Sequence, residues 1–163
     1  MDGPIQLSLP LPRSLDTRIY LQLTIRAKSI TLFVTTASSE EAGAPTPLGS
    51  FVYAIPDVCS KLMTPCPSSS THQLNTFQRY NPSQPLSTPL NTVEPTIEFT
   101  TRLAKLVAKK SQLPTYVANS VSFMGAGLGG SVEEELEAFK QVAGLVLSRL
   151  PTASQAAPVS TGP

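Results

Sequence analysis

The chain has 163 residues, a formal net charge of +1 and only 14% charged residues, which argues against nucleic acid or an anionic membrane surface as a partner. A domain of this length can bury a core without metal ions or disulfide bonds. There is no run of about 18 apolar residues and no basic-then-apolar signal pattern at the start, so we expect a soluble intracellular protein.

The first part of the chain predicts antiparallel strands. Residues 5–9 alternate and are followed by Pro10 and Pro12, which is typical of a short edge strand because proline lacks the N–H that a central ladder needs. Residues 18–26 and 30–36 alternate apolar with polar side chains and are separated by a very short connection. This pair of segments predicts a β-hairpin.

The middle of the chain combines one apolar strand with a long loop. Residues 50–56 are apolar on both faces and predict a central strand, whereas residues 57–85 are rich in proline and serine and predict a long loop. This loop contains both cysteines and the only histidine, Cys59, Cys66 and His72. A zinc site would need four ligands at suitable spacings, and no second cysteine pair exists, so we expect reduced thiols and no bound metal.

A basic helix is expected after a short strand at residues 86–91. The helix begins at Glu94-Pro95, where proline is tolerated in the first turn, and ends before Pro114. Its apolar residues share one side, and the opposite side carries a basic stripe of Arg102, Lys105 and Lys109. The stripe is either a solvated helix face or a docking surface for an acidic partner.

A strand, a glycine-rich turn and a second helix complete the expected elements. Residues 114–123 are rich in β-branched and aromatic side chains, and residues 125–130 predict a turn. Ser131 and Glu134 match a capping box at the start of the helix, where its dipole favours the neighbouring glutamates. The apolar side of this helix is expected to contain Val132, Leu136, Phe139, Ala143, Val146 and Leu150.

The glycines of this turn also allow a functional interpretation. Gly125, Gly127 and Gly130 give the G-x-G-x-x-G pattern of dinucleotide-binding turns. A Rossmann unit would continue with a second parallel strand and an acidic residue about 20 positions on, and both are missing here. A pyrophosphate would also meet three glutamates. We therefore favour a simple strand-to-helix connection and keep a nucleotide-binding enzyme as an unfavoured alternative.

Residues that could form a catalytic site are scarce. His72 lies in a loop rich in serine and threonine, and no G-x-S-x-G nucleophile elbow is present. The one dense group of carboxylates, Glu133 to Glu137, is nearly consecutive on a helix start and is not paired across a cleft. We expect no enzyme activity and no cofactor.

These elements predict one α+β domain over residues 1–150, followed by a disordered tail at residues 151–163. Its sheet would be mainly antiparallel, with two helices covering one face. The other face would be half apolar and would fit a subunit interface, unless the loop at residues 57–85 folds over it. Large or apolar groups on this face would come from Tyr20, Phe33, Val52, Ala54 and Tyr116 or Val117. The candidate partner-binding anchors among them are Tyr20, Phe33, Val52 and Tyr116.

Four segments, by their order and spacing, resemble the proteasome assembly chaperone 4 family. They are Leu86–Asn91 (LSTPLN), Arg102–Lys110 (RLAKLVAKK), Thr115–Val121 (TYVANSV) and Val132–Phe139 (VEEELEAF). The proline- and serine-rich loops and the tail resemble fungal-type members. The glycine-rich turn and the expanded loop at residues 57–85 depart from the pattern of animal members.

The resemblance implies a non-enzymatic chaperone of the cytoplasm and nucleus. Such a protein would form a heterodimer with a chaperone 3 partner and promote formation of the α-ring of the 20S proteasome by binding an α subunit. Charge would steer this docking, through either the basic stripe or an acidic turn made of Glu133, Glu134 and Glu137. A small adaptor or scaffold subunit of another intracellular complex is the alternative.

Overall fold

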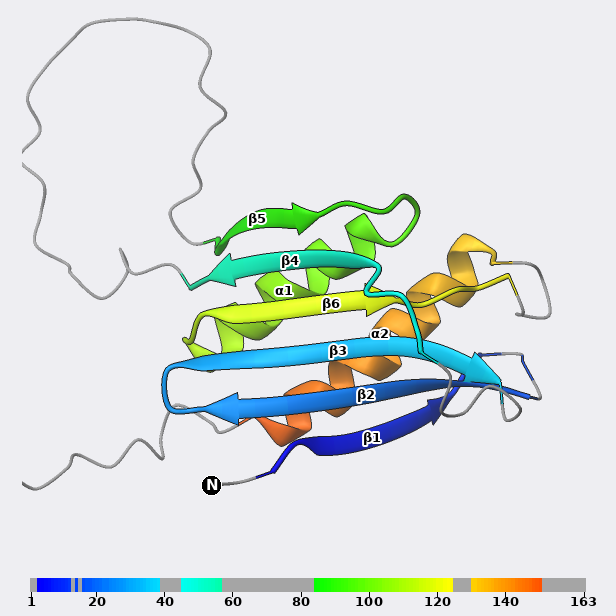
Figure 1. The fold of residues 1–163 in the computed structure, drawn as a ribbon, viewed down its shortest axis with the longest axis horizontal. Coiled ribbons are helices and arrows are strands. Elements are labelled where there is room, and N and C mark those ends of the chain that lie inside the picture. Colours follow the sequence, from blue (N-terminus) through cyan, green and yellow to red (C-terminus); the bar gives the residue numbers. More distant parts are fainter. Residues whose placement is uncertain are drawn as a thin grey trace, which may run out of the picture.

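The computed structural model describes residues 3–12, 14, 16–38, 45–56, 84–124 and 130–150. These residues form a six-stranded sheet with two helices on one of its faces (Figure 1). The expected α+β class and the placement of both helices on one face are confirmed. Most of the predicted loop at residues 57–85, most of the glycine-rich turn and the whole predicted tail lie outside the described residues.

The sheet has the order β1-β2-β3-β6-β4-β5. All neighbouring strands are antiparallel except β3 and β6, which run parallel. The predicted hairpin and the predicted edge position of the first strand are confirmed. The strands are β1 (Ile5–Pro10), β2 (Thr17–Arg26), β3 (Ser29–Ser38), β4 (Ser50–Ile55), β5 (Leu86–Asn91) and β6 (Thr115–Ser120).

Both helices lie behind the sheet in Figure 1. Helix α1 (Ile97–Ser111) packs on β4 and β6, and helix α2 (Val132–Arg149) runs obliquely behind the strands on the other side of β6. The first helix begins two residues later than the predicted Glu94-Pro95 start, because Thr96 occupies the N-cap position. Among the described residues, no helix has the length and apolar character needed to span a bilayer.

The core lies between the sheet and the two helices. The alternating side chains of β2 and β3 bury their apolar members on the helix-facing side, as predicted. They are joined there by Val117 of β6, by Leu103 and Val107 of α1, and by Val142 and Val146 of α2. Because both helices are used on this side, no described helix covers the opposite face, which we call the open face.

The buried side of α2 differs from the prediction in its first two turns. Val132 and Leu136 were expected in the core, yet they are 80% and 46% exposed. The buried stripe starts instead at Glu134 and continues at four-residue intervals through Ala138, Val142 and Val146. Residues two positions apart on a helix differ by roughly 200° in direction. The two misassigned side chains therefore lie on the solvent side of the helix.

Candidate functional site

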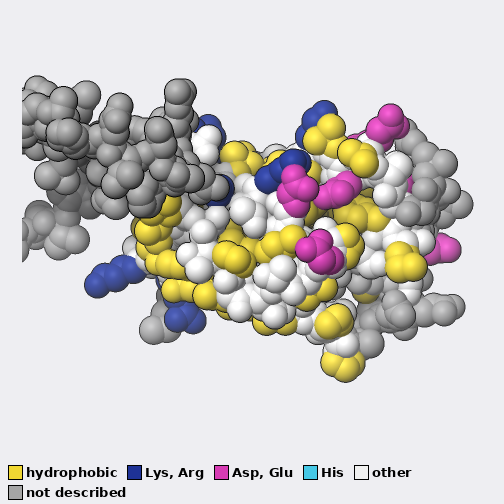
Figure 2. Space-filling view, turned by 90° about the horizontal axis from the view of Figure 1, so that it is seen from above, with side chains coloured by type: hydrophobic (Ala, Val, Ile, Leu, Met, Phe, Trp, Pro, Cys, Tyr) yellow, Lys and Arg dark blue, Asp and Glu magenta, His cyan; other side chains and the backbone are white. Residues whose placement is uncertain are grey.

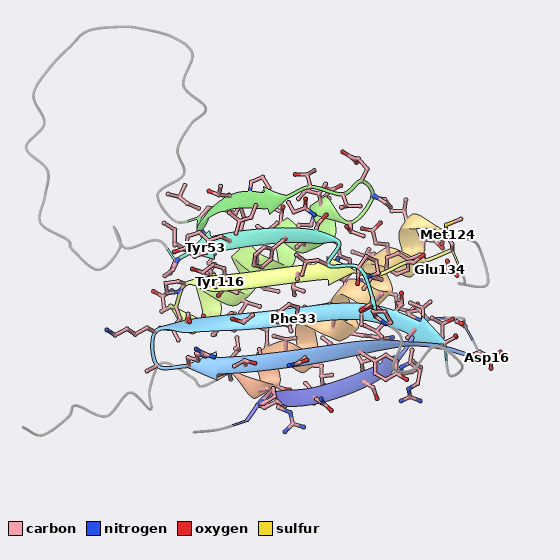
Figure 3. The ribbon with its side chains drawn as sticks, in the orientation of Figure 1. Asp16, Phe33, Tyr53, Tyr116, Met124 and Glu134 are labelled. Atoms are coloured by element: carbon pink, nitrogen blue, oxygen red, sulfur yellow. The ribbon has the colours of Figure 1, made fainter. Side chains whose placement is uncertain are left out.

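The open face carries a row of aromatic side chains across the middle of the sheet. Tyr53 of β4 and Tyr116 of β6 are paired directly, and their ring centroids are 4.7 Å apart. Phe51 extends the stack, with its ring centroid 6.3 Å from that of Tyr116. Figure 3 shows Tyr53, Tyr116 and Phe33 along this face. We call Tyr20, Phe33, Phe51, Tyr53 and Tyr116 the aromatic row.

A hollow of about 460 Å³ lies next to this row, between the sheet and residues 46–48. Tyr20 and Phe33 contribute to its lining, and Phe33 is 41% exposed. Interfaces obtain most of their binding energy from a few aromatic anchors and the pockets that receive them. The open face offers both features at one place.

Polar side chains accompany the aromatic ones on the open face. Gln22 and Phe33 are neighbours in the β2–β3 pair, and Ser120 Oγ donates to Thr35 Oγ1 at 3.0 Å. This mixture is the one expected from the sequence. Protein interfaces commonly combine an apolar centre with hydrogen-bonding groups, whereas a sealed core is far more apolar.

The prediction from the sequence that Val52 lies on the open face is wrong. Val52 and Ala54 are fully buried and face the helices, together with Val117 of the neighbouring strand. Because β4 is apolar on both sides, alternation alone does not distinguish its two faces. The signal that could have done so is size, since the small side chains lie where α1 packs and the aromatic Phe51 and Tyr53 lie outside.

The basic stripe lies on α1, away from the sheet. Arg102 and Lys109 are exposed and Lys105 is half-buried. Arg102 forms an ion pair with Glu98, one helical turn earlier. Such an exposed pair contributes little to stability, but it partly neutralises the positive charge at this end of the stripe. Lys105 and Lys109 have no such partner among the described residues.

One residue of the predicted acidic turn, Glu134, is buried and has a structural role. Glu133 and Glu137 are exposed as expected, but Glu134 is fully buried. Its Oε2 accepts hydrogen bonds from the backbone N–H of Gly130 and Ser131, at 3.2 and 3.1 Å. The predicted capping box is confirmed, and this same motif removes Glu134 from any docking surface.

Charges are separated along the long axis of the molecule. Figure 2 shows acidic side chains gathered toward one end and most basic side chains toward the other. Lys28 in the β2–β3 turn and Lys109 and Lys110 at the end of α1 lie at the basic end. The starts of both helices, with Glu94, Glu98, Glu133 and Glu135, lie at the acidic end. This polarity can orient an approaching charged partner.

No candidate metal centre is present in the part of the chain that the structure describes. It contains no group of three or more histidine, cysteine or acidic side chains placed to hold a metal ion. Cys59, Cys66, His72 and the residues 125–129 lie outside the described ranges. The predictions of reduced thiols, of no metal and of no nucleotide at the glycine-rich turn therefore stay predictions.

A family model for proteasome assembly chaperone 4 matches residues 76–121, which include β5, α1 and β6. The predicted resemblance to this family is confirmed. The chain is also similar to a solved structure, the crystal structure of a chaperone complex for yeast 20S proteasome assembly. The identity is 20%, the TM-score is 0.51, and the likeness covers 91% of this chain and 98% of the other, which shows a shared fold. A search of curated proteins found no match.

Proposed function

We propose that this chain is a non-enzymatic chaperone of 20S proteasome assembly that acts as a heterodimer with a chaperone 3 partner. The observation that carries the proposal is that neither helix covers the aromatic row on the open face. The family match and the shared fold support the same class of protein. The pairing surface in this proposal is the open face, with Tyr20, Phe33 and Tyr116 as the anchors expected from the sequence.

The dimensions of the open face suit a stable pair. Six strands about 4.8 Å apart, with six residues at about 3.3 Å each, give a face of roughly 24 by 20 Å. Together with the relief of its side chains, such a face is of the order of the ~800 Å² that each partner buries in a standard interface. Complete burial of a fully exposed large side chain contributes about 1.5–3 kcal/mol, and the half-buried aromatic side chains of this face would each contribute part of that.

A second contact in this proposal joins the helix side to a proteasome α subunit during α-ring formation. The basic stripe of Arg102, Lys105 and Lys109 is one candidate surface, and the exposed acidic pair Glu133 and Glu137 is the other. Both lie on helices, on the opposite side of the sheet from the aromatic row. One molecule could thus hold its chaperone partner and an α subunit at the same time. The cytoplasm and nucleus are the proposed locations.

Affinity purification at native expression level, with mass spectrometry of the bound proteins, tests this function. We expect a second small chaperone and proteasome α subunits, with few mature β subunits. Recovery of a different stable complex would favour the adaptor alternative. Recovery of the chain alone would contradict the proposal and would justify thermal-shift screening with NAD, NADP, ATP and GTP, because a bound ligand raises the melting temperature.

A further inference from the structure

A second hollow, of about 580 Å³, lies at the acidic end of the molecule. We call it the end cleft. Its walls come from four segments that meet beyond the end of the sheet: residues 47–49 before β4, residues 91–96 before α1, residues 119–124 at the end of β6, and the start of α2. None of the aromatic row contributes to its lining, but the end cleft shares Pro47, Leu48 and Ser120 with the first hollow and adjoins it.

Asn119 lines this cleft and leaves a hydrogen-bond donor unused. The residue is 1% exposed, and its Oδ1 accepts from the backbone N–H of Val121 at 2.9 Å. This bond fixes the orientation of the amide, so the Nδ2 group carries the remaining N–H bonds. Nδ2 is buried and has no acceptor among the described residues. Buried donors without acceptors are costly and rare, so this group needs an explanation, and an occupant of the cleft could supply the missing acceptor.

The rim of the end cleft is apolar and exposed. Leu48, Val93 and Met124 are 48%, 42% and 89% exposed, and all three line the cleft. Figure 3 shows Met124 at this end of the molecule. Large apolar side chains gathered around a hollow are typical of a surface that receives an apolar group from a partner.

The only charged side chain among the described lining residues is Glu135, and none of them is basic. An anionic ligand such as a phosphate would therefore be repelled, whereas a lysine or arginine would be attracted.

The wall between the sheet and α1 is held by internal hydrogen bonds. Ser50 Oγ accepts from the backbone N–H of Val93 at 3.0 Å and lies 2.8 Å from Thr96 Oγ1. Thr100 Oγ1 donates to the carbonyl oxygen of Thr96 at 2.6 Å. These bonds fix this one wall of the end cleft, which limits the ordering that binding requires there.

We propose that the end cleft binds an extended peptide segment of a partner protein, in which an apolar side chain stands next to a lysine or arginine. A carbonyl oxygen of the segment accepts from Asn119 Nδ2, the apolar side chain packs on Leu48, Val93 and Met124, and the basic side chain faces Glu135. The exposed rim favours a length of chain over a small ligand, which a pocket would enclose more completely. This proposal does not depend on a role in proteasome assembly.

The test uses the full chain and a displayed library of random peptides about ten residues long. We expect the selected peptides to share an apolar residue next to a basic one. A synthetic peptide with that sequence, titrated into ¹⁵N-labelled protein, should shift the NMR signals of the Asn119 side-chain amide. Met124→Ala, which removes apolar area from the rim, and Glu135→Arg, which reverses the charge, should each weaken its binding about tenfold.

Two variants outside the cleft serve as matched controls. Leu136→Ala makes the same truncation of an exposed apolar side chain, and Glu137→Arg makes the same reversal on the same helix; neither residue lines the end cleft. Both should bind the peptide within about twofold of the original chain. Thermal melting of all four variants checks that they fold.

Three results would overturn the proposal. The first is that the library yields no binder, or yields binders that lack the apolar-basic pattern. The second is that the Asn119 amide signal does not move when the peptide is at saturation. The third is that the cleft variants and the control variants weaken peptide binding equally. A shift of the Asn119 signal with NAD or ATP, but not with peptides, would equally contradict it and would assign the cleft to a nucleotide.

Discussion

Tyr116 of β6 stacks on Tyr53 of β4 across a directly paired position, with ring centroids 4.7 Å apart and an interplanar angle of 30°. Both rings lie on the face that the helices leave open, and both are half-buried. Each ring thus shields part of its neighbour while leaving apolar area available to a partner. The pair forms a preorganised centre for the proposed interface.

The stacking should be measurable in the isolated chain. Tyr53→Ala and Tyr116→Ala should each lower the free energy of unfolding. The loss in the double variant should be smaller than the sum of the two single losses by about 0.5–1.5 kcal/mol, because the pair interaction can be lost only once. Urea denaturation of the four proteins measures this coupling. Additive losses would show that the two rings do not interact in solution.

The buried carboxylate of Glu134 should matter much more than its exposed neighbour. Glu134→Ala leaves the backbone N–H groups of Gly130 and Ser131 without the acceptor seen in the structure. We expect a loss of about 1–3 kcal/mol in the free energy of unfolding. Glu133→Ala, in the same helical turn but exposed, should change it by less than about 0.5 kcal/mol. Denaturant titrations of both variants provide the comparison, and similar small losses would argue against the buried capping box.

Two glycines should respond in opposite directions to the same substitution. Gly49 has a φ of +67°, and an added Cβ would lie 2.0 Å from the backbone oxygen of Asn119. Gly49→Ala should therefore cost at least about 2 kcal/mol of stability. Gly144 lies on α2 with no atom within 4 Å of an added Cβ, so Gly144→Ala should stabilise the chain by about 0.5–1 kcal/mol. Melting curves of the two variants test the close approach of residue 49 to β6. If both substitutions stabilised the chain, this close approach would be disproved.

Reversal of charge on the basic stripe should weaken docking without unfolding the chain. Arg102→Glu with Lys105→Glu should reduce affinity for the proteasome α subunit about tenfold in a low-salt titration, while pairing with the chaperone partner is unchanged. Lys140→Glu with Arg149→Glu makes the same change in net charge on α2 and should have little effect. Equal affinity of the original chain and the first variant would exclude the stripe as the docking surface.

The local elements of this fold could be predicted because their signals are short-range. The alternation in β2 and β3 identifies both strands and their buried sides, and the spacing of Ser131 and Glu134 identifies the start of α2. The insertion of β6 between β3 and β4 was not predicted, since it depends on pairing between distant segments.

The errors at the candidate site have two physical causes. The first is that β4 is apolar on both sides, so that Val52 was placed on the face that Phe51 and Tyr53 occupy. The second is that the capping box turns Glu134 inward, which leaves Val132 exposed although helical spacing favours its burial. In both places the local pattern fits two arrangements, and tertiary packing selects one of them.

The central claim is that the open face pairs with a chaperone 3 partner. Phe33 on that face and Leu136 on α2 are similarly exposed, at 41% and 46%, so Phe33→Glu and Leu136→Glu add the same charge at comparable positions on opposite sides of the molecule. The most direct measurement is the affinity of each variant for the co-purified partner.

We predict that Phe33→Glu weakens this affinity by a factor of about 100, as expected for an aromatic anchor at the centre of an interface, and that Leu136→Glu leaves it nearly unchanged. Unchanged affinity of Phe33→Glu, or a loss confined to Leu136→Glu, would contradict the account and would place the partner on the helices.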